Sequence, residues 1–343
     1  MTESTTRVLT TVPEGWGALL DADPSASPSH RPELWEAMAA AVPAFEWRVL
    51  ELRDGGLAGG APLVISRRGP FRWLHALPWL LPAPPLARAG QHARADDALC
   101  AAFADLAAVE RAVGGEWSFY RPEGPDPAAS ALSLVPGETR RFAAAILPLA
   151  AGIDSVRSGV HRKQRQALDQ AIAQPFMFAE EASALEEAQA LHLAQSRHWP
   201  GHRPVPLELC HRLLRAGPAE ARVGRLFTLR SRHDLVSATF ALDGPHETFV
   251  WWSGTRPEGR RANAFLRLLW GVAEWAAARG RRRLNLGASG GLSQVGAFKS
   301  ALGATLVDYP VRWLDARHAS LAGRGLALVQ AFRRRGRARG EAT

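Results

Sequence analysis

The chain has 343 residues, of which 47% are hydrophobic and 22% charged, and its formal net charge is +9. This composition favours a large buried core and excludes a disordered chain. The length predicts two domains. No apolar run reaches the roughly 18 residues of a membrane-spanning helix, and the first residues lack the pattern of a secretory signal, so we expect a cytoplasmic protein.

The basic residues are almost all arginine. Of the 42 lysines and arginines, only Lys163 and Lys299 are lysine. An ammonium group is a compact, titratable point charge, whereas a guanidinium is a planar fork that stays charged. The two lysines are therefore the cations whose positions carry most information.

Two cysteines, Cys100 and Cys210, fall inside apolar helical patterns. We expect both to be reduced core residues, as is usual in the cytoplasm. Neither the cysteines nor the histidines show the close spacing of a metal site, so we expect no metal.

The first half predicts a mixed α/β unit, with a turn at Asp54-Gly55-Gly56 between two strands. The expected elements are a helix at 33–41, strands at 46–53 and 58–66, a helix at 95–113, and strands at 116–120 and 140–147.

The second half predicts helices, then three antiparallel strands, then a long helix whose apolar residues recur with helical period. The expected elements are one basic helix at 155–171, helices at 184–198 and 207–216, strands at 223–230, 235–242 and 247–253, a helix at 262–279, a strand at 282–286, a glycine cluster at 287–291, a helix at 293–301 and a strand at 305–313.

Three segments carry a family resemblance: HRKQRQALDQA, LHLAQSRHWPGHRP, and the stretch from FVWWSGTRPEGRR through LNLGASGG to GAFKSALGA. In this order they resemble the acyl-CoA N-acyltransferase (GNAT) superfamily, and more closely its double-domain, FemAB-like branch. The resemblance implies an α/β (α+β) protein with two tandem GNAT-like domains, each a mixed, mostly antiparallel sheet flanked by helices. We expect domains at 1–147 and 148–314, and a basic C-terminal helix or tail at 315–343.

The resemblance also implies an enzyme of the acyltransferase class (EC 2.3), in a bacterial setting. The donor would be acyl-CoA or aminoacyl-tRNA, and the acceptor an amine on a cell-envelope precursor, a polysaccharide or a small molecule. The alternative is a non-catalytic GNAT-fold protein that binds RNA or an anionic membrane surface from the cytoplasmic side. We find no helix-turn-helix or zinc pattern and expect no DNA partner.

Lys299, in Gly296-Ala297-Phe298-Lys299, corresponds to a functional lysine of FemAB-like enzymes. An ammonium group there could neutralise a substrate phosphate or the oxyanion that forms in acyl transfer. A surface lysine is the alternative.

Other residues are candidates for substrate binding. For the two tryptophans the alternative is a core position, for Asn263 a helix N-cap, and for His198, a candidate general base, an ordinary loop residue. The candidates are Trp251, Trp252, Ser253, Arg256, Asn263, Phe298, His198 and Trp199.

The loop Arg256–Arg261 resembles the Arg/Gln-x-x-Gly-x-Gly/Ala loop that holds the pyrophosphate of acyl-CoA. Gly259 matches, but Arg261 stands where the family has Gly or Ala, so Arg260 and Arg261 could attract phosphate by charge. A second cluster, Arg162, Lys163 and Arg165, is either a phosphate or RNA contact or a solvated helix face.

Overall fold

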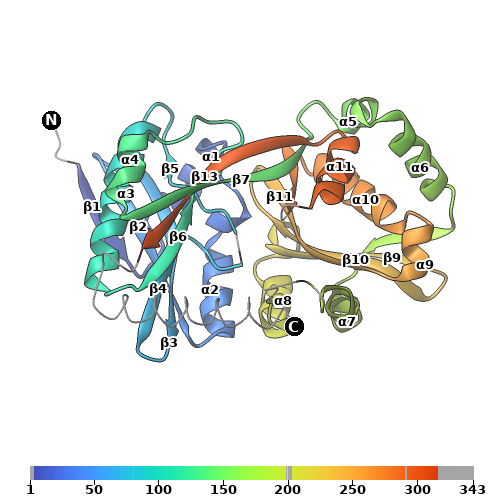
Figure 1. Ribbon diagram of the computed structural model, residues 1–343, viewed down its shortest axis with the longest axis horizontal. Helices are drawn as coiled ribbons and strands as arrows, with labels where there is room; N and C mark the ends of the chain where they lie inside the picture. Colours follow the sequence, from blue (N-terminus) through green and yellow to red (C-terminus); the bar gives the residue numbers. More distant parts are fainter. Residues whose placement is uncertain (1–3, 80, 198, 200–202, 290–291, 316–343) are drawn as a thin grey trace, which may run out of the picture. The chain divides into compact units, whose positions relative to one another are not determined.

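The computed structural model describes residues 4–79, 81–197, 199, 203–289 and 292–315. These form two compact units (Figure 1). Unit 1 contains the residues up to Ser25, Pro43–Arg141 and the residues from Tyr309, and unit 2 contains Ala26–Val42 and Phe142–Asp308. The chain therefore enters each unit more than once. The consecutive domains expected at 1–147 and 148–314 stay a prediction, and the tail falls almost wholly outside the described residues.

Unit 1 is built on a sheet whose order is β1-β2-β3-β4-β6-β13, with β5 paired to β3. All described pairs are antiparallel except β4 with β6. Helix α3 packs on this sheet, where Phe103 stacks on Trp117 at a centroid distance of 4.8 Å. The elements are β1 (Thr5–Leu9), α1 (Trp16–Ala22), β2 (Phe45–Arg53), β3 (Leu57–Arg68), β4 (Phe71–His75), β5 (Leu86–Ala87), α3 (His92–Val109), β6 (Gly114–Ser118), α4 (Ala129–Leu134) and β13 (Thr305–Asp315).

Unit 2 is built on a sheet whose order is β7-β12-β11-β10-β9-β8. Only β11 and β12 pair in parallel. Helices α10 and α11 lie on one face of the sheet and α7 and α8 on the other (Figure 1). The strands are β7 (Gly137–Pro148), β8 (Phe176–Glu180), β9 (Gly224–Ser231), β10 (Asp234–Asp243), β11 (Glu247–Thr255) and β12 (Arg283–Ala288). The helices are η1 (Pro28–His30), α2 (Pro32–Ala41), α5 (Ile153–Gly159), α6 (Arg162–Ile172), η2 (Ala182–Ala184), α7 (Leu185–Ser196), α8 (Leu207–Arg215), η3 (Ala219–Ala221), α9 (Pro257–Arg261), α10 (Ala264–Ala278) and α11 (Ser293–Ala301).

The core of unit 2 follows from the long apolar helix. Because α10 is apolar on most of its circumference, it buries Leu266, Leu269 and Val272 against β12 residues such as Leu284. The expected α/β class and the mostly antiparallel sheets are confirmed.

One expected helix is wrong. The basic segment at 155–171 forms two helices, α5 and α6, instead of one. The break falls at Val160, which is buried in the core, and at His161, whose N–H donates to the carbonyl of Ala301 at 2.9 Å. A continuous helix would direct that N–H to its own chain, so the contact with α11 and burial of Val160 outweigh helix continuation.

Strands β11 and β12 pair over only three residues each. The pairs run from Glu247 with Arg283 to Phe249 with Asn285, and the described residues beyond them form no further pair. The register between β10 and β11 also shifts, so that Trp251 has no opposite residue on β10. One edge of β11 is therefore left without a strand partner next to the end of β12.

None of the described helices is long and apolar enough to cross a membrane.

Candidate functional site

Lys299 lies on α11, above the end of β12. Its side chain is almost covered (8% exposed), and its Nζ donates to the carbonyls of Gly287 at 3.0 Å and Ala288 at 2.9 Å. Burial lowers the pKa of this amine to about 8. Lys299 is thus a desolvated ammonium ion at neutral pH, held by two carbonyl oxygens.

The aromatic side chains expected at the site lie on α11 and β11. Phe298 stacks on Phe265 of α10, with ring centroids 6.0 Å apart. Trp252 is buried and stacks on Phe240 at 5.4 Å, whereas Trp251 is half-buried. Trp252 therefore contributes to packing, and Trp251 is the tryptophan that retains accessible surface.

Helix α7 binds the backbone of β11. His192 Nδ1 lies 2.8 Å from the carbonyl oxygen of Ser253, so Nδ1 carries the proton and donates it. Gln195 Oε1 accepts from the N–H of Thr255 at 2.9 Å. The N–H of Arg256 donates to the carbonyl of Val236 on β10. Because the backbone groups of successive residues in a strand point to alternate edges, those of Ser253 and Thr255 point to the edge of β11 that lies away from β10. Two backbone groups on the open edge of β11 are thus occupied by side chains of α7.

The proposed donor loop forms the short helix α9. Gly259 is buried, and a Cβ there would come within 2.9 Å of the carbonyl of Val236. Arg256 pairs with Glu187 at 3.6 Å, and Arg260 Nε donates to the carbonyl of Thr255.

The end of this loop leads into α10. Asn263 takes a left-handed conformation (φ 55°) at the N-cap of α10 but makes no side-chain capping bond. Arg261 is exposed. The phosphate contacts expected of Gly259, Arg260 and Arg261 stay predictions.

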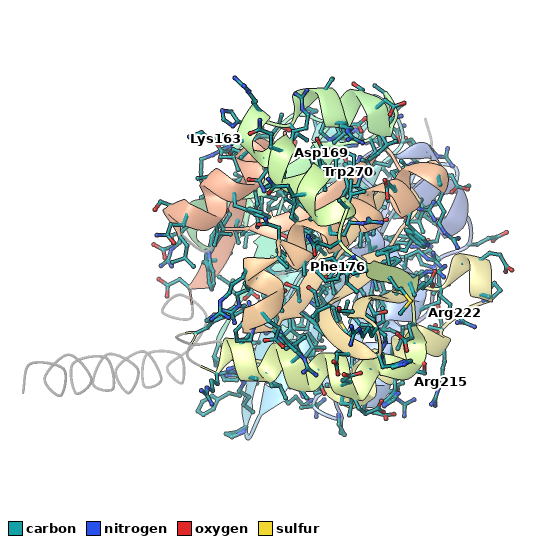
Figure 2. All side chains as sticks on the ribbon, turned by 90° about the vertical axis from the view of Figure 1, so that its right-hand side faces the viewer. Lys163, Asp169, Phe176, Arg215, Arg222 and Trp270 are labelled. Atoms are coloured by element: carbon teal, nitrogen blue, oxygen red, sulfur yellow. The ribbon has the colours of Figure 1, made fainter. Side chains whose placement is uncertain are left out.

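The basic cluster on α6 separates into two kinds of residue. Arg165 folds back onto the end of α5, where it donates to the carbonyls of Ser158 and Val160, both at 3.0 Å. Arg162 and Lys163 are exposed. Figure 2 shows Lys163 at the outer surface of the helix.

One predicted residue, Trp199, follows the end of α7. Trp199 is 45% exposed, with its ring 6.0 Å from that of His192. His198 lies outside the described residues. Cys100 and Cys210 are free and buried, as expected, and burial raises the pKa of each thiol to about 12.

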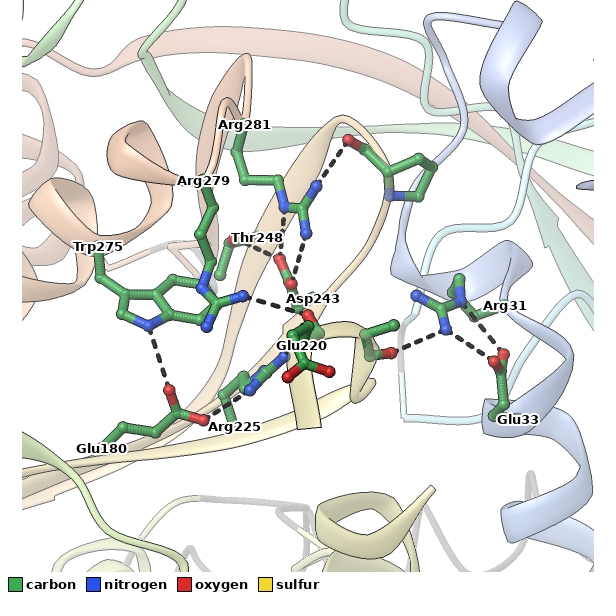
Figure 3. Close-up of polar contacts among 12 residues, drawn as sticks. Arg31, Glu33, Glu180, Glu220, Arg225, Asp243, Thr248, Trp275, Arg279 and Arg281 are labelled. Carbon is green, nitrogen blue, oxygen red and sulfur yellow. Dashed lines mark hydrogen bonds and ion pairs between the residues drawn. The ribbon is translucent and has the colours of Figure 1, made fainter. Parts of the chain in front are cut away.

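Several arginines of unit 2 are paired with carboxylates. Arg281 binds Asp243 through two bonds of 2.8 and 2.9 Å, and Arg225 binds Glu180 at 2.7 Å (Figure 3). Arg283 is buried with Glu247 at 2.7 Å. Much of the positive charge in this region is therefore neutralised internally.

Unit 1 contains a hydrogen-bonded row that sequence order did not reveal. Ser66 Oγ lies 2.9 Å from His75 Nε2, and His75 Nδ1 lies 2.9 Å from Glu116 Oε2. The three residues come from β3, β4 and β6, which are neighbours in the sheet. Ser66 is only 4% exposed and cannot be reached by a substrate, so the row links strands.

A cavity of about 420 Å³ also lies in unit 1, lined by Glu14, Arg53, Leu57 and Arg88 among others. It is not part of the Lys299 site. The described residues contain no group of side chains that could hold a metal ion.

Comparison with known proteins agrees with this architecture. Residues 154–300 match the acetyltransferase (GNAT) domain family. No curated protein sequence matches the chain. The match identifies residues 154–300 as an acetyltransferase (GNAT) domain.

Solved structures add the tandem arrangement. FemX has a TM-score of 0.68 at 12% identity, over 89% of this chain and 96% of its own. A tandem GNAT protein from the clavulanic acid pathway has 0.52 at 15%, over 91% and 98%. L-PGS from Bacillus licheniformis has 0.52 at 10%, over 96% and 98%. The chain therefore has the FemAB-like, tandem GNAT fold that its sequence suggested.

Two residues beside Lys299 escaped sequence reasoning. Glu247 and Asn285 are buried polar residues that join β11 to β12. The signal was a polar residue inside the otherwise apolar strand Leu284-Asn285-Leu286. Without the partner strand, it could not be distinguished from a surface position.

Proposed function

We propose that this protein transfers an acyl or aminoacyl group to an amine, with Lys299 as the catalytic cation. The observation that carries the proposal is the buried ammonium ion at the end of β12. Acyl transfer to an amine passes through a tetrahedral oxyanion, and a desolvated cation stabilises such a charge more strongly than a solvated one.

The donor is best supported as an aminoacyl ester, such as aminoacyl-tRNA. The arm of CoA carries two amides, which would pair with a free strand edge as an added strand does. On β11 the carbonyl of Ser253 and the N–H of Thr255 are already bonded to α7. Gly259 packs onto β10, and its loop does not present a glycine-rich backbone to a pyrophosphate.

The acceptor is proposed as an amine on a cell-envelope precursor, reached from the cytoplasmic side of the membrane. The exposed Arg162 and Lys163 of α6 would contact the phosphates of the tRNA or of the precursor. FemX and L-PGS, which share the fold, guide the choice of substrates to be tested first.

Label transfer tests the catalytic role. Wild type, Lys299→Ala and Arg212→Ala would be incubated with radiolabelled aminoacyl-tRNA and envelope precursors. We expect Lys299→Ala to lose about 100-fold or more in rate, the magnitude typical for removal of an oxyanion-stabilising group. Arg212→Ala is the control, since it removes an exposed cation of α8 that has no part in the proposed site. Full activity of Lys299→Ala would refute the assignment.

Calorimetry tests the donor. Acetyl-CoA titrated into the wild type should give no binding heat at millimolar concentration. If it binds at micromolar concentration, the donor is a thioester, and the role given to α7 is wrong. That result would leave Lys299 in place as the catalytic residue.

A further inference from the structure

The buried polar residues below Lys299 form one continuous hydrogen-bonded row. Arg283 Nε donates to Glu247 Oε2 at 2.7 Å, and Asn285 Nδ2 donates to Glu247 Oε1 at 3.1 Å. Asn285 Oδ1 then accepts from the N–H of Gly287 at 2.8 Å. The carbonyl of Gly287 in turn accepts from Lys299 Nζ at 3.0 Å. The row leads from a buried ion pair directly to the proposed catalytic cation.

The row lies at the point where the two strands stop pairing. Phe249 with Asn285 is the last pair between β11 and β12 among the described residues. Beyond it, the backbone of β12 has no strand on the β11 side to hold it. Gly287 there adopts a left-handed conformation (φ 72°) where the pairing of β12 with β7 shifts register between Asn285 and Ala288, and the side-chain oxygen of Asn285 accepts from the N–H of Gly287. The side chain of Asn285 thus replaces a missing strand partner.

Burial of this row is costly for folding. Glu247 and Asn285 are completely buried, and Arg283 is 2% exposed. Replacement of a buried ion pair by apolar residues is often neutral or stabilising, so stability alone does not account for such a row. Because the row ends at a carbonyl that binds Lys299, positioning of this amine is the function to be tested.

We propose that Asn285 and Glu247 are positioning residues for Lys299. Glu247, fixed by Arg283, orients the amide of Asn285. The amide fixes the backbone of β12 at Gly287, so that the carbonyls of Gly287 and Ala288 converge on Nζ. This inference rests on the proposed function of Lys299 for its catalytic meaning, but the positioning itself is testable without any substrate.

The chain is suited to a direct test because it has only two lysines. Competitive labelling with acetic anhydride across a pH series, read by mass spectrometry, gives the titration midpoint of Lys299, with exposed Lys163 as an internal reference. The wild-type midpoint should lie near pH 8. In Asn285→Ala the amine is no longer held below the surface, and we expect the midpoint to rise by at least about one pH unit toward the ordinary lysine range.

Matched variants distinguish an effect on the position of Lys299 from a general loss of stability of the sheet. Thr228→Val removes a buried hydroxyl of β9 that donates to Glu181 at 2.9 Å, far along the sheet order from Lys299, and should leave the midpoint unchanged. Glu247→Gln keeps an oxygen acceptor for Asn285 and should stay closer to wild type than Asn285→Ala. Should Asn285→Ala not fold, Asn285→Ser tests the same contact with a smaller cavity.

The outcomes are distinct. A rise of the midpoint confined to the row variants supports the proposal. A midpoint that stays unchanged or falls in folded Asn285→Ala and Asn285→Ser overturns it. Failure of the proposed function would appear separately, as full transfer activity of Lys299→Ala.

Discussion

At the scale of single residues, burial gives ionisable groups properties that they lack in water. Lys299 is the main case, because desolvation disfavours its charged form and lowers its pKa to about 8. The carbonyls of Gly287 and Ala288 offset part of this cost. A cation so placed acts on a neighbouring oxyanion across a medium of low effective dielectric.

The pH dependence of activity follows from this pKa. If the ammonium form is the active one, the transfer rate should fall as the pH rises through about 8, where Lys299 loses its proton. Lys299→Arg should be slower, yet should lack this fall, because a guanidinium stays charged in this range. Initial rates measured between pH 6.5 and 9.5 test this prediction. An equal fall in rate at alkaline pH in the wild type and in Lys299→Arg would contradict it.

The buried ion pair of Arg121 and Asp96 in unit 1 predicts an effect on stability. Arg121 Nη1 donates to Asp96 Oδ2 at 2.7 Å, and both side chains are at most 2% exposed. Asp96→Ala would leave a buried guanidinium unpaired and should reduce the free energy of unfolding by about 3–5 kcal/mol. Glu138→Ala removes the partner of Arg140 in an exposed pair and should cost at most about 1 kcal/mol. Urea unfolding of both variants gives the comparison, and equal effects would refute it.

At the scale of elements, close approach of α7 to β11 shapes the site. A Cβ at Gly254 would lie 2.6 Å from the backbone nitrogen of His192, so only glycine permits this contact. The contact places His192 and Gln195 on the backbone of β11. Their effect on the site therefore depends on a glycine that carries no chemistry itself.

Gly254→Ala tests the contact between these elements. The added methyl group should force α7 away from the strand and reduce the free energy of unfolding by about 1–3 kcal/mol. It should also expose the N–H of Thr255 to hydrogen exchange. Gly17→Ala is the control, since no atom lies within 4 Å of the added Cβ in helix α1, and it should be neutral or slightly stabilising. An unchanged free energy of unfolding in Gly254→Ala would show that this packing does not hold α7 on the strand.

At the scale of the whole molecule, the count of 42 lysines and arginines overstates the number of positive charges available to a partner. Arginines such as Arg225, Arg281 and Arg283 are matched by buried or half-buried carboxylates. The exposed N-terminus of α6, with Arg162 and Lys163, is one place where positive charge meets solvent.

This distribution predicts salt-dependent binding of polyanions. Affinity for tRNA should fall at least about 10-fold between 50 and 200 mM salt, since each neutralised phosphate releases counterions. The double variant Arg162→Glu, Lys163→Glu should weaken binding and flatten the salt dependence. The double variant Arg212→Glu, Arg215→Glu, on α8, is a matched charge reversal and should have a smaller effect. Fluorescence anisotropy with labelled tRNA measures both, and equal losses would argue against a specific contact by α6.

The sequence by itself determined the class of fold and the order of the main helices and strands from α7 to β13, because these depend on local periodicity. It also singled out Lys299 as a candidate, because lysine is a rare residue type in this chain. The tertiary structure decided what local pattern cannot specify. It broke the basic helix at Val160, directed Gly259 inward, and joined Glu247 to Asn285 across 38 residues of chain. Each of these depends on which backbone or side chain approaches from a distant segment, and only the folded chain brings those partners within bonding distance.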